Sequence, residues 1–196
     1  MRAKAVLFDK DGTLFDFQKS WSRWIGQEVV QISGGDPVIA AEIAAAVGFD
    51  AETGLILPHS PAIAGTEWDV ARLFLPFMPG AALEDLVAHL QQTASGLIPV
   101  EVTPLVPFLL ELAAMDLYLG VATNDSEAAA RKHLRHHGVV DMFDYVAGYD
   151  SGHGAKPEPG MCTAFAQACG LAPGNVVMVG DSRHDLDAGR AAGMQT

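Results

Sequence analysis

Cysteine is rare in this sequence. Among its 196 residues only Cys162 and Cys169 are cysteines, which is too few for a disulfide framework. Both fall in one predicted helix, and the two turns between them span about 10 Å of helix rise, too far for a disulfide. We therefore expect two buried, reduced thiols, as in a protein of the reducing cytoplasm.

Positive charge and long apolar runs are also scarce. The chain has 12 Lys and Arg residues against 24 Asp and Glu residues, and a net charge of −12. This balance disfavours nucleic acid, because affinity for nucleic acid rests largely on Lys and Arg contacts to phosphates. Asp9, Lys10 and Asp11 interrupt the only early apolar run, so we expect no signal peptide, and no run is long enough to span a bilayer. A small anionic substrate is compatible with this composition, because a few cations or a metal can reverse the field inside one pocket.

What the sequence does contain is enough apolar residues for a sizeable core, since 49% of it is hydrophobic. Helical patterns separate the later apolar runs; one of them begins with Ser126 as its N-cap and ends at Gly138. Another has Thr103 as its predicted cap and Pro104 in its first turn. The apolar runs are continuous rather than alternating, as in parallel strands covered on both faces, and lie at residues 5–9, 117–125, 145–150 and 176–181. Strand–helix alternation of this kind predicts a doubly wound, Rossmann-like α/β core.

A long insertion separates the first predicted strand from the second. About a hundred residues lie between them, too many for one crossover. Helical patterns fill this stretch, at residues 17–33, 37–47, 68–77 and 83–95. We therefore predict a core domain of residues 1–15 and 98–196, with an inserted helical domain of residues 16–97 over the carboxyl end of the first strand.

Polar residues follow each predicted strand. The carboxyl ends of parallel strands open onto one crevice, so these side chains should converge: Asp9, Asp11, Thr123, Asn124, Asp125, Asp150 and Asp181. Crowded carboxylates repel and are costly to bury, and a hard cation such as Mg²⁺ relieves both effects. Asp181 and Asp185 straddle a helix start, which suits metal binding.

A lysine and a hydroxyl complete the predicted site. Lys156 is one of only five lysines and lies in a Gly/Pro-rich loop after the third strand. A cation, the Thr123 hydroxyl and a metal together make a site for a phosphoryl group. Asp9 could then attack phosphorus as a nucleophile, and Asp11 could act as general acid and base.

Four motifs carry a resemblance to a known family. They are "DKDGT" (9–13), "ATND" (122–125), "AKPEP" (155–159) and "GDSRHDLDAGRAAG" (180–193). In order and context they resemble the motifs of haloacid dehalogenase-like (HAD) phosphatases, in the phosphoglycolate phosphatase-like branch with a helical C1-type cap. The resemblance covers the core on both sides of the insertion.

The resemblance implies a role for each matching residue. Asp9 would form an aspartyl-phosphate, and Asp11 would protonate the leaving alcohol and then activate water. Thr123, Asn124 and Lys156 would hold the phosphoryl oxygens. Asp9, the Asp11 backbone carbonyl and Asp181 would bind Mg²⁺, with Asp185 as a further ligand or as a support for the ligands. Gly12 would let the backbone turn sharply, and the Thr13 hydroxyl would support that turn.

Asp11 also bears on the reaction. In this superfamily, dehalogenases lack an acid at the Asp11 position, so the resemblance implies phosphate-ester hydrolysis of a small phosphorylated metabolite, such as phosphoglycolate. A phosphomutase of the same fold is one alternative, although mutase relatives tend to have valine where this chain has Thr13. A non-catalytic phosphate-binding or regulatory module is another.

Several features are open from sequence. Candidate specificity residues are Arg23, His59, Ser60 and Arg183, although each arginine is also compatible with an ordinary surface role. We interpret Asp125 and Asp150 as caps or turn residues, and His133, His136 and His137 as ordinary histidines near a helix end. The chain could be a monomer or a homodimer. Relatives continue into a further strand after "AAGM", so we expect either truncation or a missing edge strand.

Overall fold

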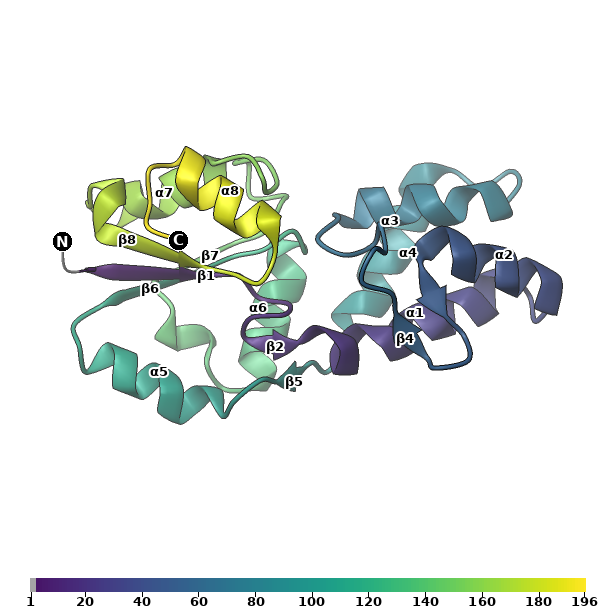
Figure 1. The fold of residues 1–196 in the computed structure, drawn as a ribbon, viewed down its shortest axis with the longest axis horizontal. Helices are drawn as coiled ribbons and strands as arrows, with labels where there is room; N and C mark the ends of the chain where they lie inside the picture. Colours follow the sequence, from purple (N-terminus) through teal and green to yellow (C-terminus); the bar gives the residue numbers. More distant parts are fainter. Residues whose placement is uncertain (1–2) are drawn as a thin grey trace. The chain divides into compact units, whose positions relative to one another are not determined.

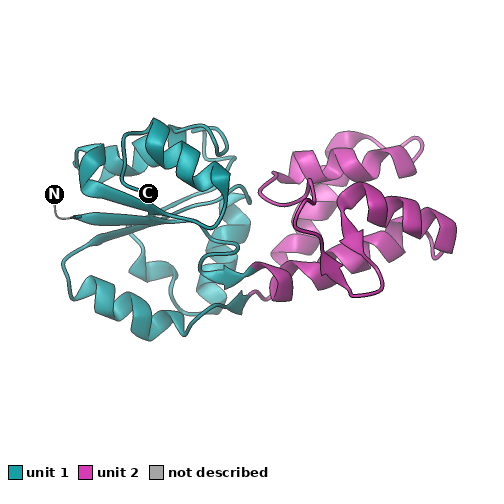
Figure 2. Cartoon of the chain, viewed as in Figure 1, with its two compact units in different colours: residues 1–16, 100–196 teal, residues 17–99 magenta. Residues whose placement is uncertain are grey.

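A computed structural model describes residues 3–196 of the chain. The chain divides into two compact units, shown in different colours in Figure 2. We call Met1–Asp16 with Val100–Thr196 the core unit, and Phe17–Pro99 the helical unit. The insertion predicted from sequence, residues 16–97, differs from the helical unit by one residue at its start and two at its end.

The core unit contains a four-stranded parallel sheet. Its strands are β1 (Ala5–Phe8), β6 (Tyr118–Ala122), β7 (Tyr145–Ala147) and β8 (Val176–Val179), in the order β7-β6-β1-β8. Leu7 of the central strand β1 pairs with Gly120 on one side and Met178 on the other. Each strand coincides with one of the continuous apolar runs, and the predicted α/β class is confirmed.

Helices cover both faces of this sheet (Figure 1). α7 (Gly160–Ala168) and α8 (Arg183–Ala191) lie on one face, and α5 (Leu105–Ala113) and α6 (Glu127–His136) lie on the other. Successive strand residues face opposite sides, so Leu7 packs in one apolar cluster with Phe165, whereas Phe8 packs in the other with Leu109. Short 3₁₀ turns, η2 (Val140–Met142) and η3 (Pro173–Asn175), lead into β7 and β8.

Two predicted helix starts have different outcomes. Ser126 caps α6 as predicted, because its side chain accepts a hydrogen bond from the backbone N–H of Ala129. The predicted cap at Thr103 is wrong: α5 begins at Leu105, and Pro104 occupies the cap position. Pro104 has φ −54° and ψ 107°, and this extended ψ places it outside the helix.

A two-stranded ribbon joins the two ends of the insertion. β2 (Phe15–Asp16) pairs antiparallel with β5 (Val100–Glu101). The chain therefore leaves the core unit and returns to it along adjacent strands, and the β1 end that carries Asp9 and Asp11 leads directly into this ribbon.

The helical unit has its own core. Its helices are α1 (Phe17–Ile32), α2 (Pro37–Val47), α3 (Glu67–Phe74), η1 (Leu75–Phe77) and α4 (Leu83–Ser95). Ile43, Phe74 and Leu90 are fully buried among them. A small hairpin of β3 (Phe49–Asp50) and β4 (Leu55–Ile56) was not predicted, because strands of two residues are too short to show a periodicity. Among the described residues, no helix is both long enough and apolar enough to cross a membrane.

The two thiols should differ in reactivity. Cys162 is fully buried, and burial raises its pKa to about 11, whereas Cys169 is partly exposed. Because the thiolate is the reactive form, we expect DTNB at pH 8 to label Cys169 quickly and Cys162 only on unfolding. Cys169→Ser should abolish the fast phase and Cys162→Ser should keep it. Equal labelling rates for both thiols in the folded protein would contradict this assignment.

Candidate active site

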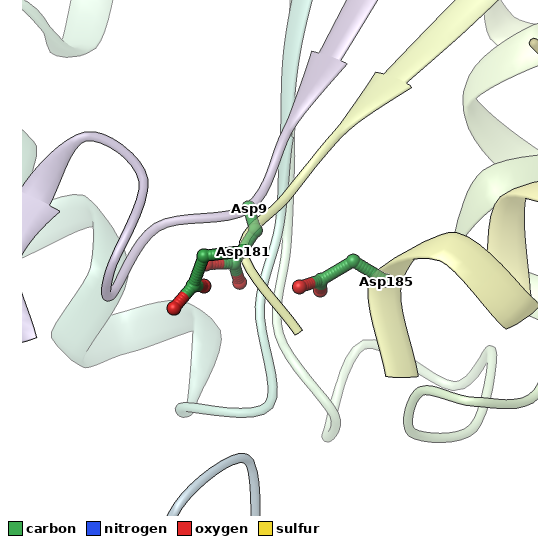
Figure 3. A group of neighbouring side chains, drawn as sticks. All are labelled: Asp9, Asp181 and Asp185. Atoms are coloured by element: carbon green, nitrogen blue, oxygen red, sulfur yellow. The ribbon is translucent and has the colours of Figure 1, made fainter. Parts of the chain in front are cut away.

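Three carboxylates meet at the carboxyl ends of β1 and β8. Asp9 directly follows β1, Asp181 follows β8 after Gly180, and Asp185 lies in the first turn of α8. One carboxylate oxygen from each lies within 4.8 Å of the other two. Figure 3 shows the Asp185 side chain reaching from its helix toward the Asp9 and Asp181 carboxylates. The adjacency of β1 and β8 in the sheet brings these residues together, although more than 170 positions separate Asp9 from Asp181.

Lys156 inserts its ammonium between two of these carboxylates. Its Nζ lies 2.5 Å from Asp9 Oδ1 and 2.6 Å from Asp185 Oδ1, and donates to the Ala122 carbonyl at 2.8 Å. The residue is only 5% exposed. Burial alone lowers the pKa of Lys156, but the Asp9 and Asp185 charges outweigh it and raise the pKa above its ordinary value. The lysine is therefore a fixed positive charge in the acidic cluster.

Asn124 holds the backbone of Lys156. Its side chain donates to the Lys156 carbonyl at 2.9 Å and accepts from the Lys156 N–H at 2.8 Å. Both residues are buried. The sequence places Asn124 in the site, and the structure shows that its side chain positions the lysine. Thr123, 2% exposed, lies beside it at the end of β6, and its Oγ1 accepts from the Asp125 N–H at 3.1 Å.

A tight turn follows Asp9. Gly12 has φ +97°, and a Cβ at this position would collide with the Asp181 carboxylate, so glycine both permits the turn and makes room for the acid. The predicted support from the Thr13 hydroxyl is wrong: its Oγ1 is buried and has no hydrogen-bond partner among the described residues. Backbone hydrogen bonds hold the turn instead, from Gly12 N–H to the Phe15 carbonyl at 2.7 Å and from Leu14 N–H to the Lys10 carbonyl at 3.0 Å.

Burial and mutual repulsion raise the pKa values of two carboxyl groups in the acidic cluster. Burial, reinforced by Asp185 and Asp11, raises the pKa of Asp9 to about 7 even though Lys156 opposes the shift. Burial first and Asp185 second also raise the pKa of Asp181. Asp9 Oδ2 is buried and has no hydrogen-bond partner among the described residues. A divalent cation fits this donor set, because carboxylate oxygens are the ligands that Mg²⁺ prefers and the charge would relieve the repulsion.

The two carboxylate oxygens of Asp185 make different contacts. Its Oδ2 accepts from the Ser182 N–H at 2.9 Å and from the Ser182 hydroxyl at 2.6 Å, in a capping box that starts α8. Its Oδ1 contacts Lys156. Asp185 therefore both caps the helix and anchors the lysine.

The structure adds residues that sequence reasoning missed. Lys10 is fully buried, and its Nζ lies 2.5 Å from Asp11 Oδ2 and 2.9 Å from Asp125 Oδ2. His133 lies 3.2 Å from the same Nζ and is 1% exposed, so it is not an ordinary helix-end histidine. Asp125 is also more than a cap, whereas Asp150 accepts from the Glu127 N–H at the start of α6 at 2.8 Å, as expected of a capping residue.

The other predicted residues lie as follows. In the core unit, Arg183 is exposed at the first position of α8. In the helical unit, Arg23 is exposed on α1 and His59 is exposed in the loop after β4. Ser60 is buried, and its hydroxyl donates to the Val47 carbonyl at 2.5 Å, so this hydroxyl ties the loop to the end of α2.

Fold and site together define a doubly wound α/β protein with a cluster of carboxylates, suited to a divalent cation, at the carboxyl edge of its sheet. The sequence matches the family model of haloacid dehalogenase-like hydrolases over residues 3–193. The chain therefore belongs to the haloacid dehalogenase-like hydrolase family, and the resemblance seen in its four motifs is confirmed.

The chain is also similar to individual proteins and solved structures. Phosphoglycolate phosphatase of Rhodospirillum rubrum is 30% identical over 201 residues, which cover 97% of this chain and 77% of that protein. Tyrosine-protein kinase PtkA of Mycobacterium tuberculosis is 39% identical over 92 residues, but these cover only 46% of this chain and 31% of the kinase. The solved structure of CbbY from Rhodobacter sphaeroides has a TM-score of 0.66 at 20% identity, and the match covers 98% of this chain and 84% of CbbY.

Loss of the Asn124 amide should release Lys156. Asn124→Ala removes two buried hydrogen bonds, so we expect the free energy of unfolding to fall by about 2 kcal/mol. Asn124→Asp should be at least as destabilising, because a carboxylate would face the Lys156 carbonyl in an already acidic site. Urea unfolding of the three proteins measures both effects. Full stability in Asn124→Asp would contradict the donor role of the amide.

The raised pKa of Asp9 should make the metal-free protein less stable as pH rises. In the folded state this carboxyl titrates near 7, against an ordinary value of 3.8, so the folded state binds more protons between these values. The Asp9 contribution to the free energy of unfolding is therefore present below about pH 4 and lost as pH rises to about 7. In EDTA, Asp9→Asn should gain stability relative to wild type across this window, as measured by urea unfolding. A stability difference that is independent of pH would contradict the shift.

Proposed function

We propose that the chain is a Mg²⁺-dependent phosphatase that hydrolyses a small phosphate monoester through an aspartyl-phosphate on Asp9. The observation that carries this proposal is the cluster of Asp9, Asp181 and Asp185, within 4.8 Å of one another and beside the buried Lys156. Asp11, two residues after Asp9, supplies a second carboxylate for proton transfer. Its side chain is 15% exposed and so within reach of solvent.

The two aspartates divide the chemistry. Asp9 attacks phosphorus, the bond from its oxygen to phosphorus forms, and the bond to the leaving oxygen breaks while Asp11 donates a proton to that oxygen. Asp11 then accepts a proton from water, the water oxygen bonds to phosphorus, and the bond to Asp9 breaks. Inorganic phosphate leaves, and both carboxyl groups return to their starting states.

The surrounding residues hold the phosphoryl group. Asp9, Asp181 and the Asp11 backbone carbonyl would hold Mg²⁺, with Asp185 as a further ligand or as the support of Lys156. When bound, the ion supplies positive charge to the phosphoryl oxygens and to the crowded carboxylates. Lys156 and Thr123 stabilise the remaining phosphoryl charge, and the Asn124 clamp keeps Lys156 in position.

Phosphoglycolate or a similar metabolite is the proposed substrate. Rhodospirillum rubrum phosphoglycolate phosphatase, at 30% identity over nearly the whole chain, supports this class of ester. We propose that the helical unit acts as a cap and that the exposed Arg23, His59 and Arg183 include the residues that set specificity, whereas Ser60, tied to the Val47 carbonyl, has a structural role. Two thiols without a disulfide are consistent with a cytoplasmic location, and we propose a monomer or homodimer.

Phosphatase activity can be tested directly. With Mg²⁺, wild type should hydrolyse 4-nitrophenyl phosphate and phosphoglycolate, and EDTA or Asp9→Asn should reduce kcat/KM by at least about 10³-fold, because removal of a nucleophile disables the whole mechanism. Asp187→Asn is the matched control, since this aspartate is on α8 but exposed. It should retain wild-type activity.

Two outcomes would contradict the proposal. Activity that survives either EDTA or Asp9→Asn would overturn the mechanism. No turnover on a broad panel of phosphate esters would favour a non-catalytic phosphate-binding module. Trapping of radiolabelled phosphate on wild type, but not on Asp9→Asn, would independently identify the covalent intermediate.

A further inference from the structure

Lys10, between the two aspartates, is a long side chain that is fully buried. An isolated ammonium is very costly to bury, so a buried lysine requires partners for its charge and for its N–H groups. Three acceptor atoms surround its Nζ: Asp11 Oδ2 at 2.5 Å, Asp125 Oδ2 at 2.9 Å and His133 Nδ1 at 3.2 Å. An ammonium has three N–H donors, and each of these atoms can accept from one of them.

The partners come from three separate segments of the core unit. Asp11 lies beside Lys10 in the turn after β1, Asp125 follows β6, and His133 lies within α6. Asp125 is itself held, because its Oδ1 accepts from the Ser126 N–H at 2.8 Å and its own N–H donates to Thr123 Oγ1 at 3.1 Å. Since an ammonium cannot accept a hydrogen bond, His133 Nδ1 must be the acceptor, and the geometry assigns the ring proton to Nε2.

The charges explain why Lys10 stays protonated. Burial alone lowers its pKa, but the Asp11 and Asp125 carboxylates outweigh burial and raise the pKa above its ordinary value. Lys156 contacts Asp9 and Asp185, so the two lysines divide four carboxylates between them. The nucleophile and the acid–base residue therefore have separate buried cations.

We propose that Lys10, fixed by Asp125 and His133, is a positioning residue that holds the Asp11 carboxylate for proton transfer. This inference rests on the proposed phosphatase function. The ammonium binds Asp11 Oδ2 and so fixes the orientation of this carboxyl group, which gives a proton to the leaving oxygen and later takes one from water. Lys10 contacts neither substrate nor metal in this role and acts only through Asp11.

The test uses the dependence of rate on the leaving group. A good leaving group such as 4-nitrophenolate departs without protonation, whereas an alkoxide needs the proton from Asp11. Lys10→Met should therefore lower kcat/KM for glycerol 2-phosphate by about 10- to 100-fold, a part of the full general-acid effect, and for 4-nitrophenyl phosphate by less than about threefold. Because kcat/KM reports on steps up to phosphorylation of Asp9, the later role of Asp11 with water does not obscure the comparison.

Controls separate positioning from folding. Lys4→Met makes the same substitution at an exposed lysine just before β1 and should change neither rate. If Lys10→Met unfolds, Lys10→Met/Asp125→Asn also removes the buried carboxylate left without its cation and carries the same test. Urea unfolding and Mg²⁺ titration by calorimetry establish that each variant is folded and binds the ion.

The outcomes are distinct. A selective loss on glycerol 2-phosphate supports the positioning role. An equal loss on both esters, a change in KM alone, or no change would overturn it while the phosphatase function stands. If wild type hydrolyses neither ester, the proposed function fails, and the role of Lys10 fails with it.

Discussion

The structure of the site depends on the pairing of buried carboxylates with two buried lysines. Neither group could be buried alone, because removing one partner of a buried ion pair typically costs about 3–5 kcal/mol. Lys156 makes the burial of Asp9 and Asp185 possible, and Lys10 does the same for Asp125. The loops after β1, β6 and β8 are therefore fixed by charge pairing as well as by the packing of the sheet.

The pairing of carboxylates with lysines is incomplete at Asp9 and Asp181, the residues of the proposed metal site. Within residues 3–196, one buried oxygen of Asp9 has no hydrogen-bond partner, and the pKa values of Asp9 and Asp181 are both raised. Such groups lower the stability of the metal-free protein, but the same repulsion is a source of affinity for a cation. A site with fully compensated charges would be more stable and would bind a metal less well, which is the usual opposition between stability and function.

The sequence predicted those parts of the molecule that a local pattern encodes. Continuous apolar runs predicted the four strands. The rule that parallel strands end at one edge placed Asp9 and Asp181 together, and the loop after the third strand added Lys156. Lys10 could not be found this way, because two of its partners, Asp125 and His133, lie more than a hundred residues away and no spacing links them to it. A lysine between two aspartates also has the appearance of a solvated turn residue. The role of Lys10 can be recognised only from the folded structure, because the fold is what places Asp125 and His133 around its ammonium.

The separation of the two lysines has a physical consequence under the proposed function. Lys156 contacts the carboxylates that would receive the metal and the phosphoryl group, so its partners change as the site fills. Lys10 is fully enclosed and binds Asp11 from the side of Asp125 and His133, so its contacts need not change with the occupant. A proton donor must keep one geometry through the approach of the substrate, departure of the alcohol and attack of water. A cation that is sealed away from the substrate can maintain that geometry, whereas a cation shared with the phosphoryl group could not.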